Sequence, residues 1–310
     1  MYTHKYSTLD YKSQVQKTLA KCAEKRAQNE FVIDWLAERE EYDYLFDVTN
    51  CATFIGFTDI AGVAHVTKAN FCRRRLCNIC VWRRQTKFVA QMFPVVDRLR
   101  RDGYQFLFAT ATIPNVPLER LTETINNMMK AYDLFLKRRK VKRAWLGKIR
   151  ALELTYNSER KDFHPHLHML VAVRPEYFHN PDLYISFNEF REYWTESMRQ
   201  VYDYPLQVKL QAVDNEEKAT VETLKYTFKT AKDSQALEGF YKSLRGRRLV
   251  SFSGVFAKVR KELKLSDFEN VLTDDLPANT TARLTFDLYK FDATGGLYKF
   301  YNKYEMELGK

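Results

Sequence analysis

Hydrophobic and polar residues recur along the chain with two periods, that of a helix and that of a strand. Apolar positions three and four residues apart predict helices. These helices cover residues 9–42 (one or two surface helices), 82–101, 118–140, 186–200 and 215–232. Pro94 lies inside the second of these segments, so we expect a kink or a break there. Ser186 precedes Glu189 by three residues, which is the pattern of a capping box at a helix start.

Short runs rich in β-branched and aromatic residues predict strands between these helices. The runs lie at residues 104–113, 149–157, 164–173 and 204–213. A short polar connection joins the second run to the third, which favours a hairpin. This order of strands and helices predicts an α+β fold, in which helices flank an antiparallel sheet.

Three regions follow from this pattern. Residues 1–100 form a helical, cysteine-bearing region, in which residues 51–80 are predicted to be rich in loops. Residues 101–265 form the α+β region, and residues 266–310 are a C-terminal extension with β-prone stretches. No stretch approaches 18 apolar residues and the N-terminus has no apolar segment, so we expect a soluble, unexported, cytoplasmic protein that spans no membrane.

Composition and charge indicate a folded protein with a negatively charged binding partner. A hydrophobic content of 45% with 22 Phe and 19 Tyr excludes a disordered chain. The net charge of +11 indicates a polyanionic partner, with nucleic acid the first candidate and an anionic membrane surface the second. Residues 137–150 hold eight basic residues and no acidic one. The other cations expected to contact DNA are Arg73, Arg74, Arg75, Arg83, Arg84, Lys225, Arg247 and Arg248.

Three of the six histidines occupy alternate positions of one predicted strand. His164, His166 and His168 therefore share a face of that strand, which continues into apolar residues. Burial of polar side chains is costly without partners, so the spacing favours a divalent metal site over histidines bonded to their neighbours. Glu153 on the hairpin's other strand is a candidate oxygen ligand, unless it faces solvent. A hard cation such as Mn²⁺ or Mg²⁺ held there would polarise a phosphodiester.

Five clustered cysteines, an odd number, argue against a disulfide framework and favour metal ligation. Cys72, Cys77 and Cys80 have ligand-like spacing, which predicts a structural zinc site. Its fourth ligand is Cys51, with His65 as the alternative.

One predicted helix carries groups suited to phosphoryl chemistry. Glu222 and Tyr226 are four residues apart, and Lys229 lies three beyond, so all three lie near one helix face. A tyrosine beside a carboxylate and a lysine can act as a nucleophile toward phosphorus. Among 19 tyrosines the same spacing also arises by chance.

Taken together, three ordered motifs resemble those of a known family. They are TATIPNV (110–116), FHPHLHMLVAV (163–173) and ETLKYTFK (222–229), preceded by the cysteine stretch FCRRRLCNICVWRR. The chain resembles the plasmid rolling-circle replication initiators, or Rep proteins, of the HUH endonuclease superfamily. Its nearest branch is the Gram-positive plasmid family with a Glu-plus-Tyr active site. The resemblance covers residues 51–256, and Ala111 stands where a bulkier apolar residue is expected.

The resemblance implies roles for particular residues. His166 and His168 would hold the divalent metal, with His164 and Glu153 as further candidates. Tyr226 would attack the nick-site phosphate, which leaves a 5′-phosphotyrosyl bond and a 3′-OH primer, and Glu222 would activate water for the terminating cleavage.

It also implies a setting for the reaction. The fold would be a central HUH-type antiparallel sheet flanked by helices, with a zinc-binding N-terminal addition. The partners would be the plasmid's double-strand origin, with a single-stranded or hairpin nick site, and a host helicase and DNA polymerase, with a homodimer possible.

Two other classes of function stay open at this point. A transposase or relaxase would use the same chemistry, although its usual tyrosine pair or appended helicase is not seen here. A non-catalytic, zinc-containing DNA-binding regulator would bind DNA without nicking it, even with Mn²⁺ or Mg²⁺ supplied.

Overall fold

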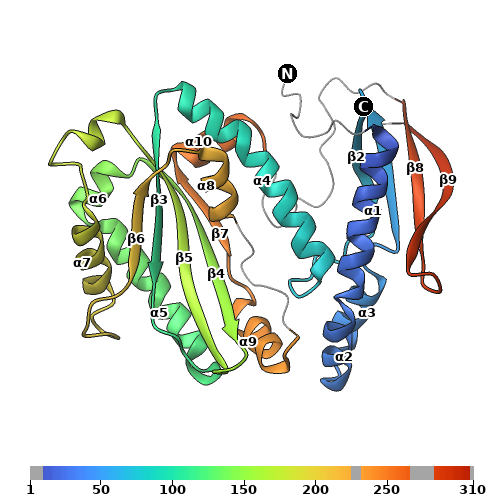
Figure 1. Ribbon diagram of the computed structural model, residues 1–310, viewed down its shortest axis with the longest axis horizontal. Coiled ribbons are helices and arrows are strands. Elements are labelled where there is room, and N and C mark those ends of the chain that lie inside the picture. The colour runs from blue at the N-terminus through green and yellow to red at the C-terminus, as the bar shows by residue number, and fades with distance from the viewer. Residues whose placement is uncertain (1–9, 225–231, 266–282, 308–310) are drawn as a thin grey trace. The chain divides into compact units, whose positions relative to one another are not determined.

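Two antiparallel sheets organise the chain. In the computed structural model, residues 10–224, 232–265 and 283–307 are described. Residues 88–266 form one compact unit, and residues 1–87 form a second together with residues 267–310 (Figure 1). The sequence had suggested a separate C-terminal extension, whereas the C-terminal strands complete a sheet with N-terminal strands.

The larger unit contains a five-stranded sheet with the strand order β6-β3-β5-β4-β7, and every pairing is antiparallel. The strands are β3 (Gln105–Thr112), β4 (Gly147–Asn157), β5 (Asp162–Val173), β6 (Val208–Ala212) and β7 (Val250–Gly254). β4 and β5 pair from Gly147↔Ala172 to Asn157↔Asp162, so the predicted hairpin is confirmed. The predicted α+β class, with helices on an antiparallel sheet, is confirmed as well.

Helices cover both faces of this sheet (Figure 1). They are the part of α4 (Asn78–Arg101) from Phe88 onward, α5 (Leu118–Lys137), α6 (Arg139–Ala144), α7 (Phe187–Ser197), α8 (Glu216–Thr223), α9 (Ser234–Leu244) and α10 (Val255–Glu262), with the short 3-10 helix Pro175–Phe178. On one face, Phe163 of β5 contacts Phe240 of α9, with ring centroids 6.1 Å apart. On the other face, Phe106 of β3 contacts Phe256 of α10 at 6.0 Å, and α8 lies in contact with β5.

The smaller unit holds a four-stranded sheet with the order β2-β1-β8-β9. Its elements are α1 (Tyr11–Ala27), α2 (Glu30–Glu38), α3 (Tyr42–Asn50), β1 (Phe54–Ile60), β2 (Val63–Ala69), β8 (Arg283–Asp292) and β9 (Leu297–Glu307). The Tyr11 hydroxyl donates to Asp287 at 3.1 Å, which ties α1 to β8. The prediction that residues 51–80 are mainly loops was wrong, because β1 and β2 form a hairpin there.

Several helix predictions can be compared with the structure residue by residue. The capping box is confirmed: Ser186 Oγ accepts from the Glu189 N–H at 3.2 Å, and Glu189 Oε2 accepts from the Ser186 N–H at 2.9 Å. The predicted helix over 118–140 ends earlier, because Arg138 has an extended ψ of 132° that separates α5 from α6. α4 continues through Pro94 without a break. Within the described residues, no helix combines the length and the apolar character needed to cross a membrane.

Candidate metal centres and active site

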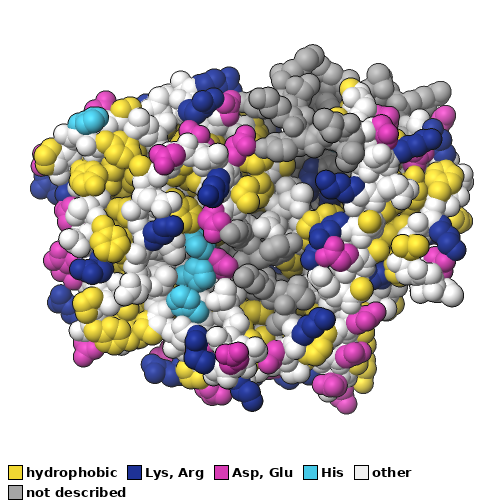
Figure 2. Space-filling view, viewed as in Figure 1, with side chains coloured by type: hydrophobic (Ala, Val, Ile, Leu, Met, Phe, Trp, Pro, Cys, Tyr) yellow, Lys and Arg dark blue, Asp and Glu magenta, His cyan; other side chains and the backbone are white. Residues whose placement is uncertain are grey.

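A glutamate and two histidines meet on one face of the five-stranded sheet. In the β4–β5 register Glu153 lies opposite His166, and His168 follows two residues later on the same face. Glu153 Oε2 lies 3.0 Å from His166 Nε2 and 2.6 Å from His168 Nε2. About a tenth of each side chain is exposed, so the group is nearly enclosed but reachable. Figure 2 shows histidine side chains gathered on this face, over the strands of the larger unit.

The second nitrogen of each imidazole is also engaged. His166 Nδ1 lies 3.2 Å from the His164 carbonyl oxygen, and His168 Nδ1 lies 3.1 Å from Thr110 Oγ1 on β3. Phe108 stacks on the His168 ring at 5.6 Å between centroids. Metal-binding histidines are commonly oriented in this way, through a hydrogen bond at the nitrogen that does not bind the ion. Both Nε2 atoms therefore point at the same carboxylate oxygen.

This donor set fits a metal ion. One ligand atom from each of Glu153, His166 and His168 lies within 4.8 Å of the others. Burial raises the pKa of Glu153, but hydrogen bonds from His166 and His168 outweigh that effect and lower the pKa to about 2. The carboxylate is thus ionised, as a metal ligand must be.

His164 lies beside this group but outside it. Its ring centroid is 5.2 Å from that of His166, yet its ligand atoms are not among those within 4.8 Å of one another. Burial lowers the pKa of His164, and the neighbouring His166 lowers it further. The candidate ligand group therefore consists of His166, His168 and Glu153, and His164 is not part of it.

The helix that carries the other catalytic candidates lies on the same face of the sheet. α8 contacts β5, which carries His166 and His168, and β4, which carries Glu153, as well as β3 (Figure 1). Its N-cap is Asn215, whose side chain accepts from the Lys218 N–H. Glu222 is in the last turn of α8 and is half-buried. The predicted nucleophile Tyr226 and the predicted cations Lys225 and Lys229 lie outside the described residues.

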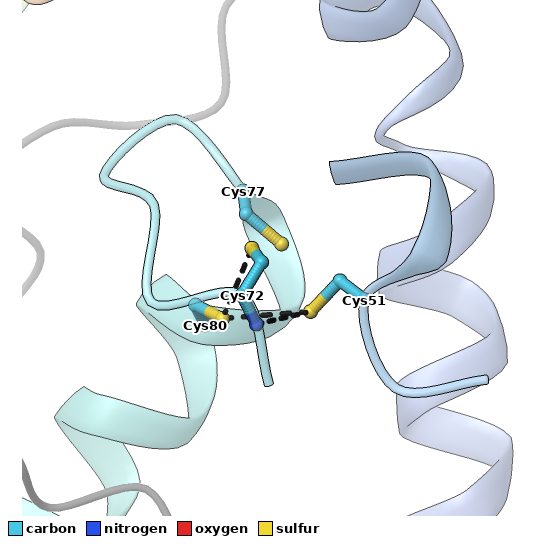
Figure 3. Close-up of side chains that lie close together, drawn as sticks. All are labelled: Cys51, Cys72, Cys77 and Cys80. Atoms are coloured by element: carbon cyan, nitrogen blue, oxygen red, sulfur yellow. Dashed lines mark hydrogen bonds between the residues drawn. The ribbon is translucent and has the colours of Figure 1, made fainter. Parts of the chain in front are cut away.

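Four cysteines form a second cluster, in the smaller unit (Figure 3). Cys51 ends α3, Cys72 lies in the loop after β2, and Cys77 and Cys80 flank the start of α4. The sulfur atoms of Cys51 and Cys80 are 3.5 Å apart, and those of Cys72 and Cys80 are 3.6 Å apart. These separations are far too long for disulfide bonds, and all four residues are free thiols.

The cysteine geometry could hold a metal ion. Four sulfurs about 2.3 Å from a tetrahedral ion lie roughly 3.8 Å apart, close to the separations observed. The Arg73 N–H donates to Cys80 Sγ at 3.3 Å, and Arg84 Nη2 donates to the Arg73 carbonyl at 3.0 Å, which fixes this loop. Cys51 is the fourth member, and His65 on β2 does not belong to the group.

Hydrogen bonds among the four sulfurs shift the pKa of three of these thiols. Burial raises the pKa of Cys77, but hydrogen bonds with Cys51, Cys72 and Cys80 outweigh burial and bring that pKa below its ordinary value. Hydrogen bonding raises the pKa of Cys51 and of Cys80 in return. A bound cation would favour deprotonation of these thiols, because the thiolate is the form that ligates a metal.

The predicted DNA-binding arginines fall into two groups. Arg83 is 6% exposed and Arg84 4% exposed, and burial lowers the pKa of Arg83 to about 10. The prediction that these two contact DNA is corrected, since so little of either side chain reaches the surface. Arg74 is half-buried and forms an ion pair with Asp47 at 2.6 Å.

Arg247 also stabilises the fold, because its Nη2 donates to Asn126 Oδ1 at 2.6 Å and joins the end of α9 to α5. Arg75 is half-buried, whereas Arg73 and Arg248 are exposed and available to a DNA phosphate.

Sequence reasoning missed the role of Thr110. The residue opens the TATIPNV motif on β3, where it pairs with His168 in the β3–β5 register. The motif carried part of the family resemblance, but the contact between Thr110 and the imidazole depends on strand pairing between segments 58 residues apart.

Fold and site thus define an α+β protein with two candidate metal centres, one on its central antiparallel sheet. The model of the family described as "Replication protein" matches residues 63–293. "Protein rep" of Streptococcus pneumoniae serotype 2 is 34% identical over 220 residues, which cover 67% of this chain and 68% of the relative. "Protein rep" of Lactiplantibacillus plantarum is 29% identical over 80% of this chain and 83% of the relative.

A third relative, "Protein rep" of Staphylococcus aureus, is 30% identical over 73% of this chain and 98% of its own length. No solved structure matches the chain. The chain belongs to the replication protein family, the Rep initiators of plasmid replication.

Proposed function

We propose that this Rep protein nicks one DNA strand at its plasmid's double-strand origin, and so primes rolling-circle replication. The observation that carries the proposal is the convergence of Glu153, His166 and His168 on one sheet face, beneath the helix that carries Glu222. A nearly enclosed carboxylate with a strongly lowered pKa between two imidazoles is the kind of group that marks a functional site. In a replication initiator, a scissile phosphodiester is the substrate that such a centre serves.

Glu153, His166 and His168 would hold a divalent cation, and their two nitrogens and one oxygen suit Mn²⁺ or Mg²⁺ with phosphate oxygens as further ligands. When bound, such an ion supplies Lewis-acid polarisation of the phosphodiester. Thr110 and the His164 carbonyl would keep both imidazoles oriented, and His164 would line the approach to the centre.

The chemical step assigned to Tyr226 is a transesterification. Its phenol oxygen forms a bond to the phosphorus while the bond from phosphorus to the 3′ oxygen breaks, and the phenolic proton passes to that 3′ oxygen. The products are a 5′-phosphotyrosyl link and a 3′-OH primer. Lys229, three residues further along the sequence, would offset the charge that develops on the phosphate.

Glu222 would end the round by accepting a proton from the water that attacks phosphorus at the terminating cleavage. Water releases a hydrolysed product, whereas tyrosine conserves the phosphoester bond for rejoining. The position of the half-buried Glu222 in the last turn of α8, a helix that contacts the strand of Glu153, supports this role.

The remaining proposals concern metals and partners. The four cysteines would hold a structural Zn²⁺, since tetrahedral thiolate sites are typical of zinc. Arg73, Arg248 and Lys225 would contact origin DNA. In the cytoplasm, where the plasmid replicates, a host helicase would separate the strands and a host polymerase would extend the primer. A homodimer stays a prediction.

A plasmid-relaxation assay tests the proposal. Wild-type protein with Mn²⁺ should convert supercoiled plasmid bearing its own origin to open circles. His168→Ala should lose at least a hundredfold in rate, whereas His179→Ala, an exposed histidine, should keep the wild-type rate. Both variants should still bind origin DNA. Undiminished nicking by His168→Ala would refute the metal centre, and binding without nicking by the wild type would favour the regulator.

A further inference from the structure

The basic run at residues 137–150 does not act as one surface. Arg138 Nη2 forms an ion pair with Glu196 at 2.6 Å, and Lys140 pairs with Glu189 at 2.6 Å. The guanidinium of Arg138 also stacks over the Tyr193 ring at 4.7 Å. These two cations therefore attach the α5–α6 junction to α7.

Two more cations of the run lie on β4. Arg150 is 5% exposed and donates to Ser251 Oγ at 3.0 Å and to the Arg248 carbonyl at 3.2 Å. Lys148 is half-buried on β4, and burial lowers its pKa. Four of the eight cations in the run are thus buried or half-buried.

The other half is exposed at one corner of the larger unit. Lys137, Arg139, Lys142 and Arg143 all have exposed side chains at the end of α5 and along α6. Across the described ranges, none of the four takes part in a salt bridge with an acidic side chain. We call these four residues the cationic corner.

An open cleft adjoins the cationic corner. Its volume is about 610 Å³, and its lining residues are Arg138, Arg139, Lys140, Arg143, Pro181, Asp182 and Tyr193. Four cations thus face a single carboxylate, Asp182. The one aromatic ring in this lining belongs to Tyr193, and Arg138 already stacks on it. The cleft offers positive charge and guanidinium donors but no free ring on which a base could stack.

We propose that the cationic corner and its cleft bind the phosphodiester backbone of duplex DNA beside the nick site. Guanidinium groups match phosphate oxygens in a two-point geometry, and closely spaced cations suit a polymer with regularly spaced charges. Single-stranded DNA is usually held by base stacking on aromatic side chains, which this cleft does not provide. The inference takes from the proposed function only that the polyanion is DNA.

The test is the salt dependence of binding to a fluorescent duplex that contains the origin. Each neutralised phosphate contributes about 0.9 to the slope of log K against log salt concentration, so Arg139→Gln/Arg143→Gln should lower the slope by about 1.8. If affinity at 1 M salt is unchanged, this difference weakens binding by about 60-fold at 0.1 M salt. Glutamine preserves helix propensity, so α6 should stay folded.

Two controls make the outcome specific to this corner. Lys12→Gln/Lys17→Gln removes the same charge from exposed positions of α1 and should leave the slope unchanged. Arg139→Lys/Arg143→Lys keeps the charge and should retain most of the wild-type slope. An unchanged slope in the glutamine variant, or an equal fall in the α1 control, would overturn the proposal.

A nicking assay separates this inference from the proposed function. On a short single-stranded oligonucleotide with the nick site, the glutamine variant should cleave at the wild-type rate, because the contacts described for Glu153, His166 and His168 involve neither Arg139 nor Arg143. Failure of the wild type to cleave would count against the proposed function alone. A loss of single-strand affinity as large as the loss of duplex affinity would overturn the assignment of duplex DNA.

Discussion

Thr110 offers a sharp test of the metal centre, because it touches a candidate ligand without being one. Its Oγ1 lies 3.1 Å from His168 Nδ1, and His168 is only 8% exposed. With Nε2 bound to an ion, Nδ1 carries the ring proton and donates it to the threonine hydroxyl. Thr110→Val keeps the shape of the side chain and removes that acceptor.

The expected magnitude follows from the burial of the imidazole. An enclosed N–H that loses its acceptor costs about 1–3 kcal/mol, because water has little access to replace the bond. Loss of a residue that orients a metal ligand typically lowers metal affinity by about 10–100-fold, or roughly 1.4–2.7 kcal/mol. We therefore expect the affinity for Mn²⁺ to fall by about 10–100-fold in Thr110→Val.

The measurement is a titration with Mn²⁺ monitored by isothermal calorimetry, with Thr112→Val as the matched control. Thr112 is two residues further along β3 on the same face, but its hydroxyl donates to the Gln207 carbonyl at 2.9 Å rather than to an imidazole. Both variants lose one hydrogen bond and should lose stability, by about 0.5–1.5 kcal/mol in Thr112→Val and by about 1–3 kcal/mol in Thr110→Val. Only Thr110→Val should lose metal affinity. Equal affinities in the two variants would refute the assigned role of Thr110.

Two other predictions concern packing and zinc. A Cβ at position 239 would lie 2.3 Å from the Phe163 ring. Urea unfolding of Gly239→Ala should therefore show a free energy of unfolding about 1–3 kcal/mol lower than that of the wild type, even though alanine has the higher helix propensity. Unchanged stability would contradict this packing. Wild-type protein should release one equivalent of Zn²⁺ on acid denaturation, and Cys80→Ser should release much less. Cys22→Ser, which changes a buried thiol outside the cluster, should keep its zinc, and zinc-free wild type would remove the structural-zinc proposal.

The histidine strand could be predicted because its signal is local. Alternation of His164, His166 and His168 followed by an apolar run has a period of two, and the short polar connection to the preceding strand predicts the hairpin. The register of that hairpin brings Glu153 opposite His166, which a hairpin argument can anticipate. The fold of the larger unit was accessible for the same reason, since its strands and helices alternate with clear periods.

The smaller unit could not be predicted as well, because its sheet depends on pairing between distant segments. β8 pairs with β1 through contacts such as Phe54↔Lys290, more than 200 residues apart in the sequence. The β1–β2 turn uses Ala61 and Gly62, both with positive φ, where alanine gives no turn signal of the Asn-Gly kind. A basic run likewise does not reveal which cations are buried, as Arg84 illustrates.

The central claim is that Tyr226 becomes covalently joined to DNA, and a denaturing gel tests it most directly. Wild-type protein incubated with Mn²⁺ and a labelled oligonucleotide bearing the nick site should give a protein–DNA adduct. Tyr226→Phe should give none, while Tyr156→Phe, a β4 tyrosine, and Glu222→Ala should still form it. An adduct of undiminished yield from Tyr226→Phe would contradict the account, because another residue would then be the nucleophile.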